Sequence, residues 1–404
     1  MEYISGGVTA AQGFVASGIH CGIRKNKSKP DLALIYSETE CTAAAVYTTN
    51  LVKGAPIVVT QKNLSDGKAK AVICNSGNAN TCNADGEEKA QRMCEIAAEV
   101  LGIRPTDVVV ASTGVIGQVL PIEPIEQAAR ALCDALSPEG SNAAATAIMT
   151  TDLIPKEAAV SVEIGGKTVK IGGISKGSGM IHPNMATMLS FVTTDCAISA
   201  PMLDKAIHEV TEKTFNMISI DGDTSTNDTF AVLANGLAGN APITAGGEDY
   251  ELFTAALEAV CRKLSKLMAG DGEGATKLLI CKASGAKDAE MAKTVAKSVI
   301  CSSLLKAAMF GADANWGRVL CAIGYSGAEV DVQKVDVSFE SAKGRVDVCR
   351  NGAGIDFSEE TASEVLSEPE ITILVELHLG DAETEAYGCD LTYDYVKING
   401  DYRT

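Results

Sequence analysis

Short apolar runs bounded by polar residues recur through the first third of the chain and predict strands in quick succession. The runs predicted as strands are DLALIYS (31–37), TAAAVYTTN (42–50), APIVVTQ (55–61), KAVICNSG (70–77) and DVVVAST (107–113). Apolar residues at helical spacing predict helices over 86–101 and 122–136, and a shorter one over 141–149. Two further strands, 158–164 and 167–174, are joined by Gly-Gly, which predicts a hairpin.

The second half of the chain mixes the same two kinds of element. Helices are predicted over 201–217, 248–268 and 288–309. Predicted strands are MLSFVTTDC (188–196), FAVLANG (230–236), TKLLICKASGA (276–286), KVDVSFE (334–340), GRVDVCR (344–350), EITILVELHL (370–379) and DAETEAYGCDLT (381–392). Because strands and helices do not alternate regularly, the pattern favours an α+β fold with antiparallel or mixed sheets over a doubly wound parallel sheet.

Composition narrows the class of protein. Of the 404 residues, 46% are apolar and 21% are charged, which is typical of a folded protein with ample core. The net charge of −18 argues against a nucleic-acid partner, since no basic excess is available to neutralise phosphates. The acidic excess lies almost wholly in residues 187–404, where 18 basic face 34 acidic side chains. A solvated acidic face is the favoured interpretation.

Thirteen cysteines are spread along the chain without a CxxC pair or zinc-ligand spacing. Most lie in apolar runs, and they predict buried free thiols in a reducing cytosol. No basic segment followed by an apolar stretch opens the chain, and no run of about 18 apolar residues occurs, so neither a secretory signal nor a membrane span is expected. We therefore expect a cytoplasmic protein without membrane contact.

Common catalytic signatures are missing from the sequence. It holds no phosphate-binding G-x-x-x-x-G-K-[ST] loop, no G-x-S-x-G elbow and no H-E-x-x-H. Only four histidines are present, and a structural role is the expectation for each. Asp221, Asp223 and Asp228 do not follow calcium-loop spacing, so no metal is assigned. The amide- and hydroxyl-rich segments NSGNAN (75–80) and DGDTSTND (221–228) fit either buried polar networks or ordinary polar turns.

The most informative segment is SKGSGMIHPNMATMLSF (175–191), in which a Gly-rich polar stretch passes into an apolar strand at Thr187. A hydroxyl after a small residue suits self-cleavage, because the oxygen can attack the preceding carbonyl and form an ester that water hydrolyses. The freed Thr187 would then carry both a nucleophile and a base, since an α-amine of pKa about 8 can take the hydroxyl proton. Taken alone, a Thr at this position is more often an ordinary strand residue.

The same segment resembles the KGSGMI-P-MATML signature of the ornithine acetyltransferase family, also called glutamate N-acetyltransferase. The resemblance extends along almost the whole chain, in blocks that stand in the family's order. These blocks are GGVTAAQGF (6–14), YTTNLVKGAP (47–56), NSGNANTCNADG (75–86), ASTGVIGQ (111–118), MTTDLIPK (149–156), DGDTSTNDT (221–229), GDGEGATKL (270–278), FGADANWGRV (310–319) and YVKINGDYRT (395–404).

The resemblance implies a layered α/β/β/α sandwich with a smaller C-terminal lobe. It implies a precursor cut between Ala186 and Thr187 into an α chain, 1–186, and a β chain, 187–404. Two α and two β chains would form a heterotetramer. The implied activity moves an acetyl group from N2-acetylornithine to L-glutamate without a cofactor. Some members of the family also accept acetyl-CoA as a donor substrate, and no motif in this chain decides between the two kinds.

Site residues follow from the same match. Thr187 would be the nucleophile, with Thr113 and Gly114 stabilising the oxyanion. Implied substrate contacts are Thr150, Lys176, Thr187, Glu273, Asn399 and Thr404. The assignment of Thr150 is loose by one residue, because Thr151 is chemically equivalent. Gly400 and Arg403 depart from the family's usual tail.

A cation at Lys176 suits a substrate carboxylate, and a carboxylate between glycines at Glu273 suits a substrate ammonium. Taken singly, each residue has a plainer interpretation: Thr113 and Gly114 as an ordinary strand exit, Thr150 as a helix cap, and Lys176 and Glu273 as solvated side chains.

Two other functions share some of these features. The first is a related self-processing aminopeptidase or amidohydrolase with an N-terminal nucleophile, in which water replaces glutamate as the acceptor. The second is a catalytically silent protein that binds acylated amino acids and stays as one chain. Acetate release with and without glutamate separates the hydrolase from the transferase, and a denaturing gel showing two pieces excludes the binding protein.

Overall fold

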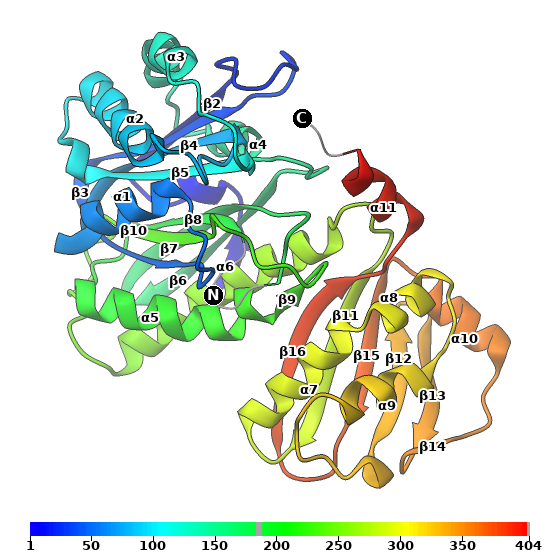
Figure 1. Cartoon of the computed structure of the whole chain (residues 1–404). Coiled ribbons are helices and arrows are strands. Elements are labelled where there is room, and N and C mark those ends of the chain that lie inside the picture. The colour runs from blue at the N-terminus through cyan, green and yellow to red at the C-terminus, as the bar shows by residue number, and fades with distance from the viewer. Residues whose placement is uncertain (183–187, 402–404) are drawn as a thin grey trace.

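The computed structural model describes residues 1–182 and 188–401 and divides into two lobes, each built on one sheet (Figure 1). The larger lobe holds a nine-stranded sheet. Its strands, in order across the sheet, are β1 (Glu2–Ile4), β6 (Lys156–Ile164), β7 (Lys167–Lys176), β8 (Leu189–Thr194), β10 (Thr229–Ala234), β3 (Leu32–Tyr47), β4 (Lys68–Asn78) and β5 (Val108–Val115), with β2 (Phe14–Ile19) paired to β3.

Strand β3 folds this sheet into two facing layers. Its first half pairs with β2 and β4, its second half pairs with β10, and the register against β4 shifts between Tyr36 and Cys41. One buried core therefore joins inward side chains from both layers, such as Ile35 and Val109 from one and Phe191 and Leu233 from the other. Alternate residues of the same strands point outward into two other cores, as a strand period of two requires.

Helices cover both outer faces of the folded sheet (Figure 1). The layer of β3, β4 and β5 is covered by α1 (Ala55–Asn63), α2 (Gly86–Leu101) and α3 (Glu123–Asp134). The other layer is covered by α5 (Ala200–Lys213) and α6 (Glu248–Gly270), while α4 (Ser141–Ala147) packs into the central core. The predicted α/β/β/α layering is thus confirmed.

The smaller C-terminal lobe holds a seven-stranded sheet that packs against the far end of α6. Its strands, in order, are β14 (Ala353–Gly354), β13 (Gly344–Arg350), β12 (Asp336–Ser341), β15 (Glu370–Glu376), β11 (Leu278–Ala286), β16 (Ala382–Cys389) and β9 (Ile218–Ser219). Its helices are α7 (Ala289–Cys301), α8 (Ser303–Phe310), α9 (Trp316–Gly324), α10 (Glu359–Leu366) and α11 (Tyr393–Gly400). Single 3-10 turns lie at Gly7–Thr9, Leu64–Asp66, Pro105–Asp107, Phe215–Met217 and Val332–Lys334.

Most predicted elements are confirmed, including the hairpin of β6 and β7. The strand predicted over 55–61 is wrong, because this segment forms α1. Pro56 near its start suits a helix, and packing against β5 and α2 outweighs the β-branched composition. The strands predicted over 31–37 and 42–50 are one bent strand.

Helices α9, α10 and α11 were not predicted. None of the helices in residues 1–182 and 188–401 combines the length and apolar character that a membrane span requires.

Candidate functional site

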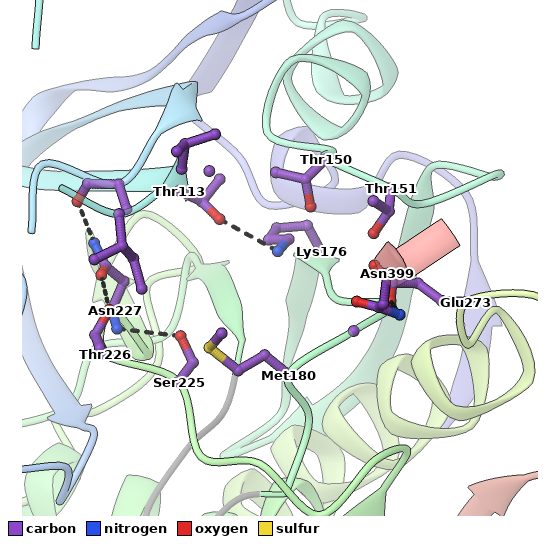
Figure 2. A pocket seen from close by; sticks show the side chains of 15 residues that line it. Thr113, Thr150, Thr151, Lys176, Met180, Ser225, Thr226, Asn227, Glu273 and Asn399 are labelled. Carbon is purple, nitrogen blue, oxygen red and sulfur yellow. Dashed lines mark hydrogen bonds between the residues drawn. The ribbon is translucent and has the colours of Figure 1, made fainter. Parts of the chain in front are cut away.

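A cavity of about 340 Å³ opens where the two lobes meet, and it gathers residues from seven separate stretches of the chain (Figure 2). Its lining residues are Ala79, Thr113, Gly114, Val115, Ile116, Thr150, Thr151, Lys176, Gly179, Met180, Ser225, Thr226, Asn227, Glu273 and Asn399. All six of the sequence-predicted site residues that the structure describes belong to this list. Ala186, Thr187 and Thr404 lie outside the described residues.

Thr113 and Gly114 occupy the end of β5, where that strand passes the end of β4. The register breaks here: Gly77 lies opposite Gly114, and Asn78 then pairs with both Thr113 and Val115. Gly114 has a φ of +134°, and a Cβ there would lie 2.3 Å from the carbonyl carbon of Gly77. Only glycine fits this bulge, which turns the strand end toward the cavity.

Lys176 ends β7 and is 8% exposed, so the surface interpretation of this lysine is wrong. Its Nζ donates a hydrogen bond to Thr113 Oγ1 at 3.3 Å (Figure 2). It is the one cationic side chain among the residues that line the described part of the cavity. A buried ammonium in a cavity is a strong site for a carboxylate, because little water competes for it.

Glu273 and Asn399 form the opposite wall (Figure 2). Glu273 lies in the loop between α6 and β11, is 8% exposed, and donates its backbone N–H to Ser178 O at 2.9 Å. Asn399, on α11, donates from Nδ2 to Glu273 Oε2 at 2.7 Å. Gly179 packs so closely that a Cβ there would lie 2.4 Å from the Glu273 carboxylate.

Thr150 and Thr151 both line the cavity, so the structure does not separate them.

Behind them lies a buried ion network that was missed in the sequence. Lys156 Nζ donates to Asp152 Oδ1 at 2.6 Å and to Asp271 Oδ2 at 2.5 Å.

Asp152 also anchors the two flanking segments, accepting from the backbone N–H groups of Thr150 at 2.9 Å and Gly177 at 2.7 Å. Burial alone would raise the pKa of Asp152, but the charges of Lys156 and Lys176 lower it to about 2. Asp152 therefore stays ionised, and the network joins the start of β6 to the end of α6.

The end of the segment 221–228 is buried, and Asn227 there lies at the centre of a polar network. Asn227 Nδ2 donates to Ala79 O at 2.6 Å and to Ser112 O at 2.9 Å. Its Oδ1 accepts from the hydroxyls of Thr81 and Thr226, each at 2.6 Å. One amide thus joins the loop to the ends of β4 and β5.

Residues 75–80 belong to the same network, since Ser112 Oγ donates to Asn75 Oδ1 at 2.6 Å and Asn75 Nδ2 donates to Asn78 O at 3.0 Å. At the other end of the loop, Asp221 accepts from the backbone N–H groups of Met180 and Ile181 at 2.5 and 2.9 Å. Sequence reasoning noticed both segments but assigned no role to Ser225, Thr226 or Asn227. The signal was their density of amides and hydroxyls between apolar strands.

Neither histidines nor metal ligands contribute to the cavity in the part of the chain that the structure describes. No histidine lines it, and His182 instead lies beside Ser219 Oγ at 3.0 Å. Burial lowers the pKa of His182 to about 4, with the charge of Lys297 acting in the same direction. No group of three or more His, Cys, Asp or Glu side chains suited to a metal ion occurs among these residues.

Opposite charges on facing walls give the cavity its chemical character. Lys176 suits a carboxylate, Glu273 suits an ammonium, and the threonines and amides between them offer hydrogen bonds. Because Lys176, Thr113 and Asn227 lie on strand ends or in short loops tied by buried networks, this part of the cavity is preorganised for a small zwitterionic molecule.

Comparison with known proteins gives concordant results. The profile of the ArgJ family matches residues 15–404. A protein of Symbiobacterium thermophilum named arginine biosynthesis bifunctional protein ArgJ is 54% identical over 406 residues, covering 100% of both chains. A protein of the same name from Caldanaerobacter subterraneus is 51% identical, again over 100% of both. The crystal structure of the ArgJ protein from Bacillus halodurans matches with a TM-score of 0.51 at 46% identity, covering 54% of this chain and 100% of that one.

Proposed function

This chain belongs to the ArgJ family, whose enzymes are acyltransferases of arginine biosynthesis, and on that premise we propose that it moves an acetyl group from N2-acetylornithine to L-glutamate. The products are ornithine and N-acetylglutamate. The observation that carries this proposal is the pair of opposite charges, Lys176 and Glu273, on facing walls of one cavity.

Both substrates carry an α-carboxylate, for which Lys176 is the buried cationic partner. N2-acetylornithine adds a side-chain ammonium, which Glu273 would hold. Glutamate instead presents a second carboxylate at that end. Asn399 suits either side chain, since its amide both donates and accepts hydrogen bonds. Thr150 and Thr151 line the space between, where they would contact the bound amino acid, and Thr404 would add a contact from the tail.

The chemistry proceeds through an acetyl-enzyme on Thr187. The Thr187 oxygen attacks the acetyl carbonyl carbon while the α-amine of Thr187 takes the hydroxyl proton. The Thr113 hydroxyl and the Gly114 backbone N–H stabilise the resulting oxyanion. Ornithine leaves with that proton on its α-nitrogen, and the acetyl group stays on Thr187 as an ester. The amine of glutamate then attacks the ester, and the Thr187 oxygen leaves with a proton.

A free α-amine on Thr187 requires cleavage between Ala186 and Thr187. The products are an α chain of residues 1–186 and a β chain of residues 187–404, and we propose two of each in the assembly. The match to the Bacillus halodurans chain supports this division, because it covers 54% of this chain and residues 187–404 make up the same share. The two pieces would stay joined, since β7 pairs with β8 from Ile171 and Thr194 to Lys176 and Leu189.

No cofactor is needed for this transfer, and acetyl-CoA enters the proposal only as a second donor. We expect N2-acetylornithine to be the better donor, because Lys176 is the one cation among the described residues that line the cavity, which gives little attraction for a large anionic coenzyme. Saturating glutamate and comparing kcat/KM for the two donors tests this. A higher kcat/KM for acetyl-CoA would contradict the charge argument.

The function itself is tested by incubating the enzyme with N2-acetylornithine in the presence and absence of glutamate. We expect ornithine and N-acetylglutamate in equal amounts when glutamate is present, and little turnover without it. Acetate released at the same rate in both incubations would instead identify a hydrolase.

A further inference from the structure

Asp228 is a buried acid for which the proposed transfer has no use. It is 2% exposed and lies directly before β10. Its Oδ2 atom is buried without a hydrogen-bond partner among the residues that the structure describes. Leaving a buried carboxylate oxygen unpaired costs several kcal/mol by order of magnitude, so such an atom calls for a functional explanation.

A small cavity of about 20 Å³ adjoins this side chain. Its lining includes Asp228 together with Thr113, Lys176, Met188 and Ser225. Three of these five residues, Thr113, Lys176 and Ser225, also line the main cavity, so the two spaces are neighbours. A space of roughly 10–15 Å³ or more admits one water molecule when polar groups surround it, and here a carboxylate, an ammonium and two hydroxyls do.

The strand register places Asp228 beside Met188, the residue that follows Thr187 in the sequence. Strands β8 and β10 run parallel with Leu189 opposite Thr229, and Thr229 N donates to Met188 O at 2.9 Å. One residue back along each strand, Asp228 therefore lies next to Met188, which is bonded directly to Thr187.

Self-cleavage has a requirement that transfer does not have. Before cleavage the nitrogen of Thr187 is an amide, which cannot accept the hydroxyl proton, and no histidine lines either cavity. We propose that Asp228 accepts the Thr187 hydroxyl proton during self-cleavage, directly or across one water in the small cavity. This inference rests on the proposed function, because it assumes cleavage at Thr187.

The step balances without any other reactant except water. The Thr187 oxygen bonds to the Ala186 carbonyl carbon as its proton passes to the Asp228 carboxylate. The Ala186–Thr187 C–N bond then breaks, and Asp228 returns the proton to the departing nitrogen. Water hydrolyses the resulting ester, which leaves a carboxylate on Ala186 and the free hydroxyl on Thr187. The Asp228 carboxylate is thereby regenerated beside the new α-amine.

Cleavage should consequently depend on pH. Burial raises the pKa of Asp228 well above its ordinary value, while the Ser225 hydroxyl, the Lys176 charge and the Thr48 hydroxyl oppose that shift. Lys176 is the other titratable side chain that faces the small cavity among the described residues. Only the carboxylate form of Asp228 accepts a proton, so the cleavage rate rises with pH through this raised pKa and levels off above it.

The test follows cleavage of the full-length precursor made by cell-free synthesis, using denaturing gels and intact mass. We expect Asp228→Asn to slow cleavage by about 100-fold or more, the range typical of a lost general base. Asp223→Asn, which alters an exposed acid of the same loop, should leave the rate unchanged. A folded Asp228→Asn chain that cleaves as fast as the parent would overturn the proposal.

Two further measurements keep the outcome decisive. If Asp228→Asn does not fold, as judged by circular dichroism, the pH profile of the parent chain decides: a rate that does not change with pH would overturn the role of Asp228. Thr187→Ala separates this inference from the function beneath it. A Thr187→Ala chain that still cleaves contradicts the proposed function itself, whereas an uncleaved Thr187→Ala chain beside a freely cleaving Asp228→Asn chain contradicts only the inference.

Discussion

The two walls of the cavity are built in different ways. The wall that carries Thr113, Gly114 and Asn227 belongs to the folded nine-stranded sheet and is fixed by buried amide networks. The opposite wall ends on α11, a helix without a buried residue, where a single hydrogen bond joins Asn399 to Glu273. The contrast indicates that reaction geometry is held rigidly on one side, while recognition of the substrate side chain rests on fewer contacts on the other.

Breaking the junction beneath both walls should have the largest effect. Lys156 is fully buried between Asp152 and Asp271, so Lys156→Met leaves two buried carboxylates without their cation. We expect a loss of about 3–5 kcal/mol in the free energy of unfolding, measured in denaturant. Lys167→Met, at the exposed turn of the β6–β7 hairpin, is the matched control and should change stability little. Equal stability of the two variants would contradict the view that this network stabilises the fold.

The wall that carries Thr113, Gly114 and Asn227 is tested next with the variant Thr113→Val. Removal of one oxyanion donor lowers kcat by about 10²–10³-fold in comparable sites, and we expect a loss of this size with a smaller change in KM. Thr106→Val, an exposed change just before the same strand, controls for the substitution itself. An unchanged kcat would mean that Thr113 is an ordinary residue at the end of a strand and does not stabilise the oxyanion.

Substitutions in the wall formed by Glu273 and Asn399 should change KM more than kcat. A hydrogen bond to a charged group contributes about 1.5–3 kcal/mol, so Glu273→Gln should raise KM for N2-acetylornithine by roughly 10- to 150-fold. A donor without the side-chain ammonium, N-acetylnorvaline, should be almost indifferent to the same change. If KM rose equally for both donors, Glu273 would position the neighbouring residues and would not bind the ammonium.

The smallest effect is expected at Asn399. Asn399 is exposed on α11, so water competes for its hydrogen bond to the Glu273 carboxylate. We therefore expect about 0.5–1.5 kcal/mol, or about 2- to 12-fold in KM, for Asn399→Ala. Lys397→Ala on the same exposed helix is the control. A rise in KM as large as that of Glu273→Gln would mean that the two walls of the cavity are equally fixed, contrary to the difference described above.

The layering was predictable because strand periodicity is strong where one face meets a core. The segments that form β4, β5, β6 and β7 were identified on that basis. The Gly-Gly link between β6 and β7 predicted that these two strands form a hairpin. The prediction failed at 55–61, where the sequence APIVVTQ carries β-branched residues that favour a strand. There Thr60 Oγ1 donates to Val110 O at 2.8 Å and its oxygen accepts from Val110 N, a tertiary contact that no local pattern reveals.

The site residues also divide into those that the sequence identified and those that only the fold reveals. Lys176 and Glu273 were identified through the family's motifs, but their burial and their position on facing walls come from the fold. Lys156 was missed because its two carboxylate partners lie 4 and 115 residues away. Asp228 was considered as a metal ligand and as part of the polar segment 221–228, but the sequence does not show that its carboxyl is buried beside β8.

The central claim, that one oxygen both cleaves the chain and carries the acetyl group, is tested most directly by intact mass measurement. The purified enzyme is mixed with N2-acetylornithine in the absence of glutamate, beside a Thr187→Ala chain treated identically. We predict two pieces for the parent, with one acetyl group on the piece that begins at Thr187, and a single unacetylated chain for the variant. A Thr187→Ala protein that is cleaved or acetylated like the parent would contradict the account.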